Sequence, residues 1–435
     1  MNMQQVKFIS ELFDHYDGKT IDSYIKSGGF KGFETFLKKG IGKTVDEIAS
    51  SGLQGRGGAA YPTGKKLTQA RAAKGVRKFV VCNADEGEPG TFKDRELLKQ
   101  NIFQVIEGMI IAGACADAKE GIIYVREEYK NIHDQIASAI EQCYEYNYLG
   151  KNIQGSSIDF DLRLFSGAGA YVCGEGFAMC ESLEGKSGRP RSKPPYVKQE
   201  GFLNFPTLVI NTETLSAMVS ILRKGADRFK EYGTDYSTGT KLISISGKVN
   251  KPGVYEIPFG CTIQEIIDEL AGGMKDGSTG NFVQIGGASG GILPRRLWNT
   301  RYTYEDLEEK GLSVGSGAIV VADREMNILR YLQIVQDFFR HESCGKCTPC
   351  REGNRQLHLI FQKMVIGKMT RKDFARLDMV LDLMKKTSLC GSGKTEVVPF
   401  ITAKKYFPKA FTYVEFPQKA SPLVASAKED KEAVS

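Results

Sequence analysis

Three cysteines, Cys344, Cys347 and Cys350, stand at positions i, i+3 and i+6, and this run constrains the chain more than any other feature. Thiolates with this spacing can surround one inorganic cluster and bind three irons of a [4Fe–4S] cubane. Cys390 is the only other cysteine in the C-terminal third and is the candidate fourth ligand. Structural zinc and a set of reduced thiols are the alternatives, but zinc usually takes two separated Cys-x-x-Cys pairs. The spacing therefore favours a [4Fe–4S] cluster and the handling of single electrons.

The composition is that of a soluble globular protein. The chain has 435 residues, 41% hydrophobic and 26% charged, which is enough for roughly two to four domains. Its net charge is +7, but the basic residues are scattered, which argues against nucleic acid as a partner. Residues 1–19 lack the apolar run of a signal peptide, and the best apolar stretch, 108–116, is about half a membrane span. We therefore expect a cytoplasmic protein without direct membrane insertion, whose cysteines are reduced.

Apolar periodicity predicts alternating strands and helices in the first half of the chain. This alternation is typical of an α/β layer structure with ligands at the strand ends. After a composition shift at 233–240, the pattern predicts a small α+β unit, and from 326 onward it is helical. The predicted strands are 76–82, 121–125, 160–165, 241–246, 253–257 and 318–321, and the predicted helices are 4–16, 44–50, 101–118, 133–146 and 262–270.

A glycine-rich loop at 51–66 is a candidate anion site. Gly55 and Gly57 allow a phosphate to approach the backbone closely, and Arg56 and Lys66 supply positive charge. The spacing matches neither a P-loop nor a dinucleotide fingerprint. The alternative is a flexible turn.

A polar loop follows the predicted strand that ends at Cys82. It carries Asn83, Asp85, Glu86 and Glu88, whose amide and carboxylate groups suit ribityl or ribose hydroxyls and ring nitrogens. The alternative is a solvated acidic turn, which we would favour if this segment stood alone.

A second glycine-rich turn, at 167–176, leads into a helix. A nucleotide can lie over such a helix N-terminus, and Tyr171 can stack on a ring. Lys193 and Tyr196 offer another cation and aromatic pair, for which a rigid proline turn at the surface is an equally good interpretation.

Taken together and in this order, the motifs resemble one family. Over roughly residues 50–416 the chain closely resembles the NADH-oxidising flavoprotein subunit of respiratory complex I and its soluble relatives. Those relatives are NAD-reducing and electron-bifurcating hydrogenases, NAD-linked formate dehydrogenases and multimeric transhydrogenases. The resemblance implies an α/β flavin-binding domain, a small β-grasp (α+β) domain and a C-terminal helical bundle that carries the iron–sulfur cluster.

The resemblance also divides the chain into five expected parts. They are an N-terminal helical segment (1–50), an FMN- and dinucleotide-binding α/β domain (51–236), a β-grasp domain like soluble ligand-binding modules (237–325), a helical [4Fe–4S] domain (326–417) and a disordered tail (418–435).

Residue roles follow from the resemblance, position by position. FMN is expected on Gly55, Arg56, Gly57, Lys66, Asn83, Asp85, Glu86, Tyr171, Gly174, Glu175, Asn211 and Thr214. NAD(H) is expected near Tyr61, Glu88, Gly176, Lys193 and Tyr196, with Glu88 beside the nicotinamide and flavin N5 as the candidate catalytic residue. Cys344, Cys347, Cys350 and Cys390 are expected to hold the cluster.

The implied function is hydride transfer between NAD(H) and FMN, followed by one-electron transfer through the cluster to partner subunits. Because no ferredoxin-like cysteine run occurs elsewhere, further clusters are expected on partners, foremost a thioredoxin-like [2Fe–2S] subunit, together with further redox subunits.

Five positions depart from the family pattern, one of them Tyr61, which replaces another aromatic residue. Gly176 replaces a glutamate that contacts the adenosine ribose and repels a 2′-phosphate, so discrimination against NADP(H) should weaken. Gln69 stands where the family often has a phenylalanine, and Ile210 replaces an asparagine near the flavin. Gly87 is closer to the hydrogenase type, which favours a soluble complex. The alternatives are the NADH-input subunit of membrane complex I, an NADP(H)-using variant, and a relay scaffold that no longer binds dinucleotide.

Overall fold

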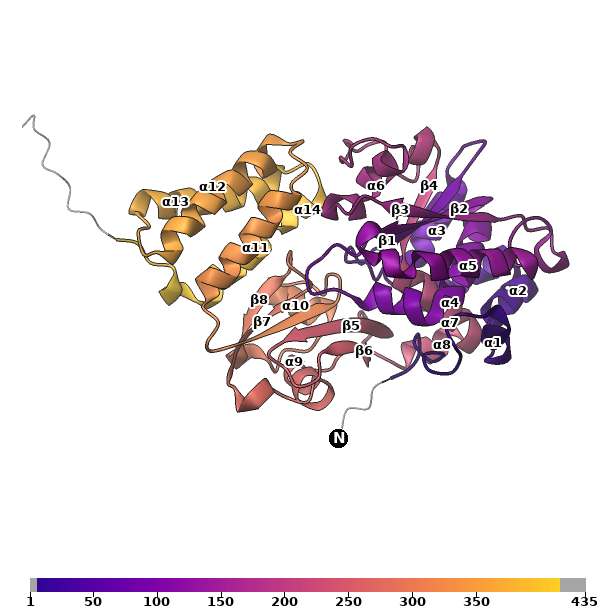
Figure 1. Ribbon diagram of the computed structural model, residues 1–435, viewed down its shortest axis with the longest axis horizontal. Coiled ribbons are helices and arrows are strands. Elements are labelled where there is room, and N and C mark those ends of the chain that lie inside the picture. Colours follow the sequence, from indigo (N-terminus) through magenta and orange to yellow (C-terminus); the bar gives the residue numbers. More distant parts are fainter. Residues whose placement is uncertain (1–5, 415–435) are drawn as a thin grey trace, which may run out of the picture.

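The computed structural model describes residues 6–414, so the predicted tail at 418–435 lies outside the described residues. Figure 1 shows three parts in chain order: an α/β layer structure in indigo to magenta, a smaller β-rich part in pink, and a helical bundle in orange to yellow. The predicted fold class is confirmed.

The first sheet has four parallel strands in the order β3-β2-β1-β4. Its centre is β1, whose Cys82 lies in register with Ile123 of β2 and Ile210 of β4. The carboxyl ends of β1 and β4 therefore lie side by side, at Asn83 and Asn211. The strands are β1 (Phe79–Ala84), β2 (Glu120–Arg126), β3 (Asp161–Gly167) and β4 (Thr207–Asn211).

Helices cover both faces of this sheet, which explains why its central strands β1 and β2 are apolar on both sides. Val80 and Cys82 of β1 pack into the main core with the long helices α4 and α7, whereas Phe79 and Val81 pack on the opposite face against α6. The helices of this part are α1 (Ile21–Lys26), α2 (Lys31–Ser50), α3 (Thr63–Ala72), α4 (Lys93–Ala116), α5 (His133–Glu145), α6 (Gly176–Leu183), α7 (Thr212–Lys224) and α8 (Ala226–Lys230).

The helix predicted at 4–16 is wrong, because residues 6–16 form turns and bends. The apolar residues of this segment are buried as the pattern indicated, but their backbone amides bond to a distant carboxylate. Glu256 accepts hydrogen bonds from the N–H groups of Phe8, Ile9 and Ser10 at 2.8–3.0 Å. A buried carboxylate with several N–H donors replaces the intrahelical acceptors that these amides would otherwise need.

The second sheet is mixed, with the strand order β6-β5-β9-β7-β8. Strands β5 and β9 are parallel and the other pairs antiparallel. This part of the molecule has a hydrophobic core of its own, which includes Trp298 and Tyr302. Its elements are β5 (Thr240–Gly247), β6 (Gly253–Pro258), α9 (Ile263–Glu265) continued by a π-helical turn (Ile266–Leu270), β7 (Gly280–Ile285), β8 (Gly291–Pro294), α10 (Tyr304–Glu309) and β9 (Ala318–Asp323).

The helical bundle packs on the β7–β8 side of the second sheet. Phe282 and Ile292 of that sheet belong to the bundle's core, and Ile292 donates its N–H to Thr402 Oγ1 at 2.9 Å. The bundle helices are α11 (Ile328–Glu342), α12 (Thr348–Val365), α13 (Arg371–Thr387), α14 (Gly391–Thr395) and α15 (Val398–Tyr406).

Within residues 6–414, the structure contains no helix with both the length and the apolar character that a bilayer span requires.

Candidate functional site

A cavity of about 740 Å³ opens at the carboxyl ends of β1 and β4, where ligands of open α/β sheets bind. Its volume is in the range of small-molecule and cofactor sites. It brings together most of the predicted FMN and dinucleotide residues: Gly55, Gly57, Tyr61, Lys66, Asn83, Gly174, Glu175, Gly176, Lys193, Tyr196, Asn211 and Thr214.

Two asparagines at the strand ends form part of the cavity wall and are fixed in place. Asn83 donates its side-chain amide to the carbonyl of Gly174 at 2.9 Å. Asn211 caps α7 by accepting from the Glu213 N–H at 3.0 Å, and it donates to Asp94 Oδ2 at 2.7 Å. Because both side chains are held by the fold, their polar groups are preorganised for a ligand.

The glycine-rich loop lies directly on this wall. A Cβ atom added at Gly57 would stand 2.9 Å from Asn211 Cβ, so only glycine allows the loop to approach so closely. The Arg56 N–H donates to Thr214 Oγ1 at 2.9 Å, which ties the loop to α7.

Lys66 lies in the first turn of α3 and lines the cavity. Among the residues that the structure describes, no carboxylate pairs with its ammonium group. Burial away from water lowers its pKa to about 8. A partly desolvated cation without a counter-charge is suited to a phosphate.

The mouth of the cavity is polar and aromatic. Glu175 caps α6 by accepting from the N–H groups of Phe177 and Ala178, and its other oxygen pairs with Lys193 at 2.8 Å. Tyr61 and Tyr196 are 38% and 49% exposed as residues and line this mouth, where aromatic rings can receive a planar ligand.

Asp85 lies next to Gly174 of the cavity wall, although it is absent from the lining. Its Oδ2 atom is 3.8 Å from the position of a Cβ at Gly174 and has no hydrogen-bond partner within residues 6–414. Burial raises the pKa of this carboxyl to about 7. An orphaned buried carboxylate beside the cavity fits a hydroxyl-rich ligand that would donate to it.

Two other predicted residues have structural partners outside the cavity. The Arg56 guanidinium points to the second sheet, where it donates to the carbonyls of Thr238 and Thr240 at 3.0 Å each. Glu86 accepts from the Asp94 and Arg95 N–H groups and so caps α4, and burial raises its pKa to about 7.

Glu88 and Tyr171 join the three parts of the molecule. Glu88 accepts from the Tyr171 hydroxyl at 2.8 Å and from the N–H and hydroxyl of Ser289 at 2.7 and 2.9 Å. The Tyr171 ring packs against Phe338 of α11. A contact of Glu88 or Tyr171 with a bound ligand stays a prediction.

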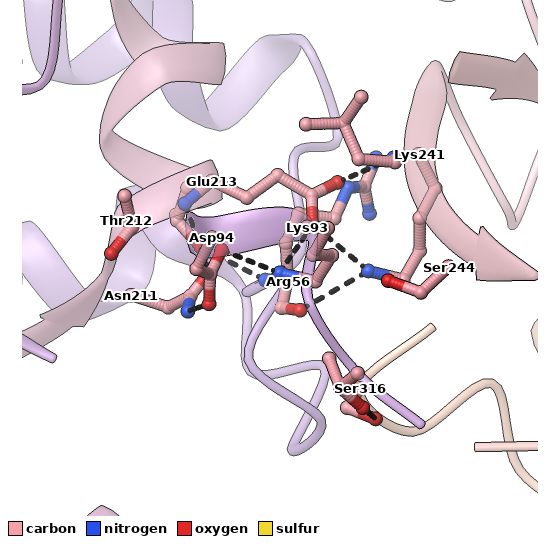
Figure 2. Close-up of polar contacts among 12 residues, drawn as sticks. Arg56, Lys93, Asp94, Asn211, Thr212, Glu213, Lys241, Ser244 and Ser316 are labelled. Atoms are coloured by element: carbon pink, nitrogen blue, oxygen red, sulfur yellow. Dashed lines mark hydrogen bonds and ion pairs between the residues drawn. The ribbon is translucent and has the colours of Figure 1, made fainter. Parts of the chain in front are cut away.

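A buried network of charges connects the cavity wall to the second sheet (Figure 2). Glu213 pairs with Lys93 at 2.8 Å and with Lys241 of β5 at 3.0 Å, and Lys93 also pairs with Asp94 at 2.7 Å. Burial opposes the charge on Glu213, but the two ammonium groups outweigh it and hold its pKa below the usual range. Since Asp94 also accepts from Asn211, the network fixes the polar wall of the cavity.

The four predicted cluster cysteines gather at one end of the bundle. Cys344 and Cys347 lie between α11 and α12, Cys350 is in the first turn of α12, and Cys390 caps α14. All are free thiols. Burial raises the pKa of Cys390, and the nearby Cys344 and Cys347 sulfurs raise it further.

This cysteine site adjoins the cavity. Gly391, the residue after Cys390, lines the cavity, and Glu175 lies close enough to Cys390 to raise its pKa. No three His, Cys, Asp or Glu side chains of the described chain converge as the ligands of one metal ion do. Four thiols are the donor set of a [4Fe–4S] cluster. Because such a cluster is larger than a single ion, its ligands lie farther apart than those of one metal ion.

Two cavity residues carry polar groups that the motifs do not single out as site residues. Lys198 lines the mouth and donates to Gln69 Oε1 at 2.6 Å. Gln69 departs from the family pattern, but nothing in that pattern marks it as a polar partner. The sequence feature that could have indicated Lys198 as a site residue is its position two residues after Tyr196, in a basic segment that contains prolines.

Comparison with known families gives each part of the chain a counterpart. The Nuo51 FMN-binding domain matches residues 48–220, the SLBB domain matches 242–293, and the NADH-ubiquinone oxidoreductase-F iron–sulfur binding region matches 330–413. The chain is thus a flavoprotein subunit with an FMN-binding domain and a [4Fe–4S] region.

Three curated relatives show the range of the similarity. The NADP-reducing hydrogenase subunit HndC of Solidesulfovibrio fructosivorans is 39% identical over 94% of this chain and 83% of its own length. The NADH-quinone oxidoreductase F subunit 2 of Rhizobium meliloti is 37% identical over 91% of this chain and 94% of its own length. The NAD-reducing hydrogenase HoxS subunit alpha of Cupriavidus necator is 39% identical over 85% of this chain and 60% of its own length.

A solved structure agrees with these relatives. A NAD⁺-reducing [NiFe]-hydrogenase in the H₂-reduced state aligns with a TM-score of 0.81 and 34% identity over 90% of this chain. This chain spans 66% of that hydrogenase chain. The protein belongs to the family of FMN- and [4Fe–4S]-binding subunits that includes the F subunits of NADH-quinone oxidoreductases and the NAD(P)-reducing hydrogenase subunits.

Proposed function

We propose that this chain catalyses FMN-dependent hydride transfer from or to NAD(H) and passes electrons singly through its [4Fe–4S] cluster to partner subunits. The observation that carries the proposal is the contact between the two sites. Gly391, next to Cys390, forms part of the wall of the cavity that Asn83, Asn211 and Lys66 also line. An electron that leaves a flavin in this cavity would have a cysteine-bound cluster as its neighbour.

The residues of this chain have binding and orienting roles. When bound, FMN supplies the exchange between a two-electron hydride and single electrons. Lys66 would pair with its phosphate, and the glycine-rich loop would let that phosphate approach the backbone. Asn83 and the orphaned Asp85 carboxylate would hold polar groups of the cofactor. The aromatic mouth at Tyr61 and Tyr196 would receive the dinucleotide and limit water.

The partners follow from the relatives. We propose a soluble cytoplasmic complex in which a thioredoxin-like [2Fe–2S] subunit and further redox subunits take up the electrons. The similarity to HndC over 94% of this chain supports a hydrogenase-type assembly. Copurified subunits test this point, and copurification with membrane-spanning subunits would favour the NADH-quinone oxidoreductase assembly instead.

The activity is tested on anaerobically purified protein. We expect bound yellow FMN, about four irons per chain, and bleaching of the flavin by a reduced nicotinamide dinucleotide. The Cys347→Ser variant provides a control, since it should lose iron and the reduction of one-electron acceptors while its flavin still bleaches. Protein that stays colourless after reconstitution, or a flavin that neither NADH nor NADPH bleaches, would contradict the proposal.

A further inference from the structure

The charges that line the cavity do not balance. The lining contains three lysines, Lys66, Lys193 and Lys198, and one carboxylate, Glu175. Glu175 pairs with Lys193 at 2.8 Å, which leaves the other two lysines without a carboxylate partner in the described chain. Lys66 is accounted for by the phosphate of FMN in the proposed function. The positive charge of Lys198 is therefore free to pair with a second anionic group of a ligand.

Lys198 is positioned but not neutralised. Its ammonium donates to Gln69 Oε1 at 2.6 Å, and the Tyr61 hydroxyl donates to the same oxygen at 2.9 Å. Gln69 is a neutral acceptor, so it fixes the direction of the lysine without cancelling its charge. An ammonium group has three N–H donors, which leaves Lys198 with donors for a ligand.

The surroundings of Lys198 suit the adenosine end of a dinucleotide. Its ammonium lies 5.5 Å from the centre of the Tyr196 ring, and Tyr196 and Tyr61 are both exposed residues of the cavity lining whose rings suit a purine. The nicotinamide must lie deep, against the flavin, so the adenosine is left at the mouth. With a purine stacked on these rings, the Lys198 ammonium would lie near the ribose attached to that purine, where it could pair with an anionic group on the ribose.

No free carboxylate of the cavity opposes such an anion. Gly176 contributes no side chain, and its Cα faces Val197, with an added Cβ only 3.2 Å from Val197 Cγ2. Val197 is the neighbour of Lys198 in the chain and is apolar, and the polar groups that meet at the lysine, from Gln69 and Tyr61, are neutral.

We propose that Lys198, oriented by Gln69, binds the 2′-phosphate of NADP(H) and makes this cavity accept NADP(H). The inference rests on the proposed function, because it assumes that a nicotinamide dinucleotide occupies the cavity. The inference adds NADP(H) as the substrate class and assigns Lys198 as the residue that recognises its 2′-phosphate.

Two adenosine nucleotides test the role of Lys198 without any redox turnover. Calorimetric titration of the FMN-loaded protein with adenosine 2′,5′-bisphosphate and with adenosine 5′-monophosphate measures what the 2′-phosphate contributes. We expect the bisphosphate to bind about tenfold to a hundredfold more tightly, the range of a hydrogen bond to a charged group. Lys198→Gln should abolish this ratio, and Lys198→Arg should keep much of it.

Lys186→Gln is the matched control, because Lys186 is an exposed lysine paired with Glu184 and lies outside the cavity lining. It should leave the ratio unchanged, and no variant should alter the FMN content. The same pattern is expected in flavin bleaching, with Lys198→Gln lowering kcat/KM for NADPH about tenfold or more and that for NADH less than about twofold.

Three results would overturn the assignment. Equal weakening of both nucleotides by Lys198→Gln would place the lysine on the phosphates that NAD(H) also carries. An unchanged ratio in Lys198→Gln would remove it from recognition altogether. Failure of both nucleotides to bind the wild-type FMN-loaded protein, while NADH still bleaches its flavin, would overturn this inference and leave the proposed function standing.

Discussion

Lys66 is the residue whose environment gives the sharpest pH dependence. Burial lowers its pKa to about 8, so in the FMN-free protein the ammonium loses its proton as the pH rises through that value. A phosphate needs the charged form. The dissociation constant of FMN should therefore be flat below about pH 8 and rise up to about tenfold per pH unit above it.

Fluorescence titration of the FMN-free protein between about pH 7 and pH 10 measures this effect. Lys66→Gln should bind FMN about tenfold to a hundredfold more weakly and without the rise above pH 8. Lys65→Gln is the adjacent, exposed control and should behave as the wild type. A Lys66→Gln variant that keeps the rise would assign the pH dependence to another group.

The residues of the site were predictable only where a motif carried them. The glycine-rich loop and Asn83 were predictable from the residues themselves, one as a close approach to a phosphate and the other as part of a polar loop after a strand, whereas Asn211 followed only from the family resemblance. Lys198 lies in an irregular segment between α6 and β4, and only the fold brings its ammonium to Gln69 of α3. The position of the Arg56 guanidinium was equally hidden, because the Thr238 and Thr240 carbonyls that it bonds lie more than 180 residues away.

Secondary-structure elements were predictable where burial and local pattern agree. Strand β2 and helix α5 lie within a residue of their predicted limits. Strand β1 begins at Phe79 rather than at 76, because Val76 is 99% exposed and has no sheet partner. Strand β4 was missed because it is five residues long and follows Pro206 in an irregular segment. The helix at 4–16 failed for a tertiary reason, the carboxylate of Glu256.

Helix α7 depends on the buried pairs of Glu213. Glu213→Gln would leave the buried Lys241 without its carboxylate and the buried Lys93 with Asp94 as its remaining ion pair within the described residues. Removing one partner of a buried ion pair typically lowers the free energy of unfolding by about 3–5 kcal/mol. We expect a loss of this size in denaturant unfolding of the Glu213→Gln variant, together with weaker FMN binding through Asn211.

Glu11→Gln is a matched control for this prediction. Glu11 also faces two cations of α7, Arg223 and Lys224, at 3.2 and 3.0 Å, but its side chain is 41% exposed. Exposed pairs contribute about 1 kcal/mol or less, so this variant should unfold close to the wild type.

Because the pKa of Glu213 is held down, its contribution to the free energy of unfolding is present near neutral pH and is lost on acidification. The Glu213→Gln variant should lack that acid sensitivity. Equal losses in both variants would contradict the argument.

At the scale of the whole molecule, the α/β part and the bundle line the cavity together, and the second sheet is joined to the α/β part. The bundle contributes Gly391 to the cavity wall, and Lys346 of the cysteine run donates to the Pro190 carbonyl at 2.6 Å. The second sheet reaches the flavin-binding part through Lys241 and through Ser289, which donates to Glu88. The arrangement of the domains is therefore part of the site, and a loosened interface should be visible in the affinity for FMN.

Arg56 offers a direct test of this coupling. Its guanidinium donates to two carbonyls of the second part and lies 5.0 Å from the Phe259 ring, while its backbone belongs to the loop between Gly55 and Gly57. Arg56→Met keeps the apolar stem and removes the donors, which leaves the buried Thr240 carbonyl and the half-buried Thr238 carbonyl without this partner at a cost of about 3 kcal/mol. We expect faster proteolytic cleavage in residues 225–240. Because the glycine-rich loop shifts with the Arg56 side chain, we also expect FMN binding weakened about tenfold.

Arg295→Met is the control. It removes an exposed arginine with a similar ring contact, at 5.7 Å from Trp298, and should change neither the cleavage rate nor the affinity for FMN. If Arg56→Met were cleaved faster yet bound FMN as the wild type does, the glycine-rich loop would keep its geometry without the second sheet, and the two parts would be joined but not coupled.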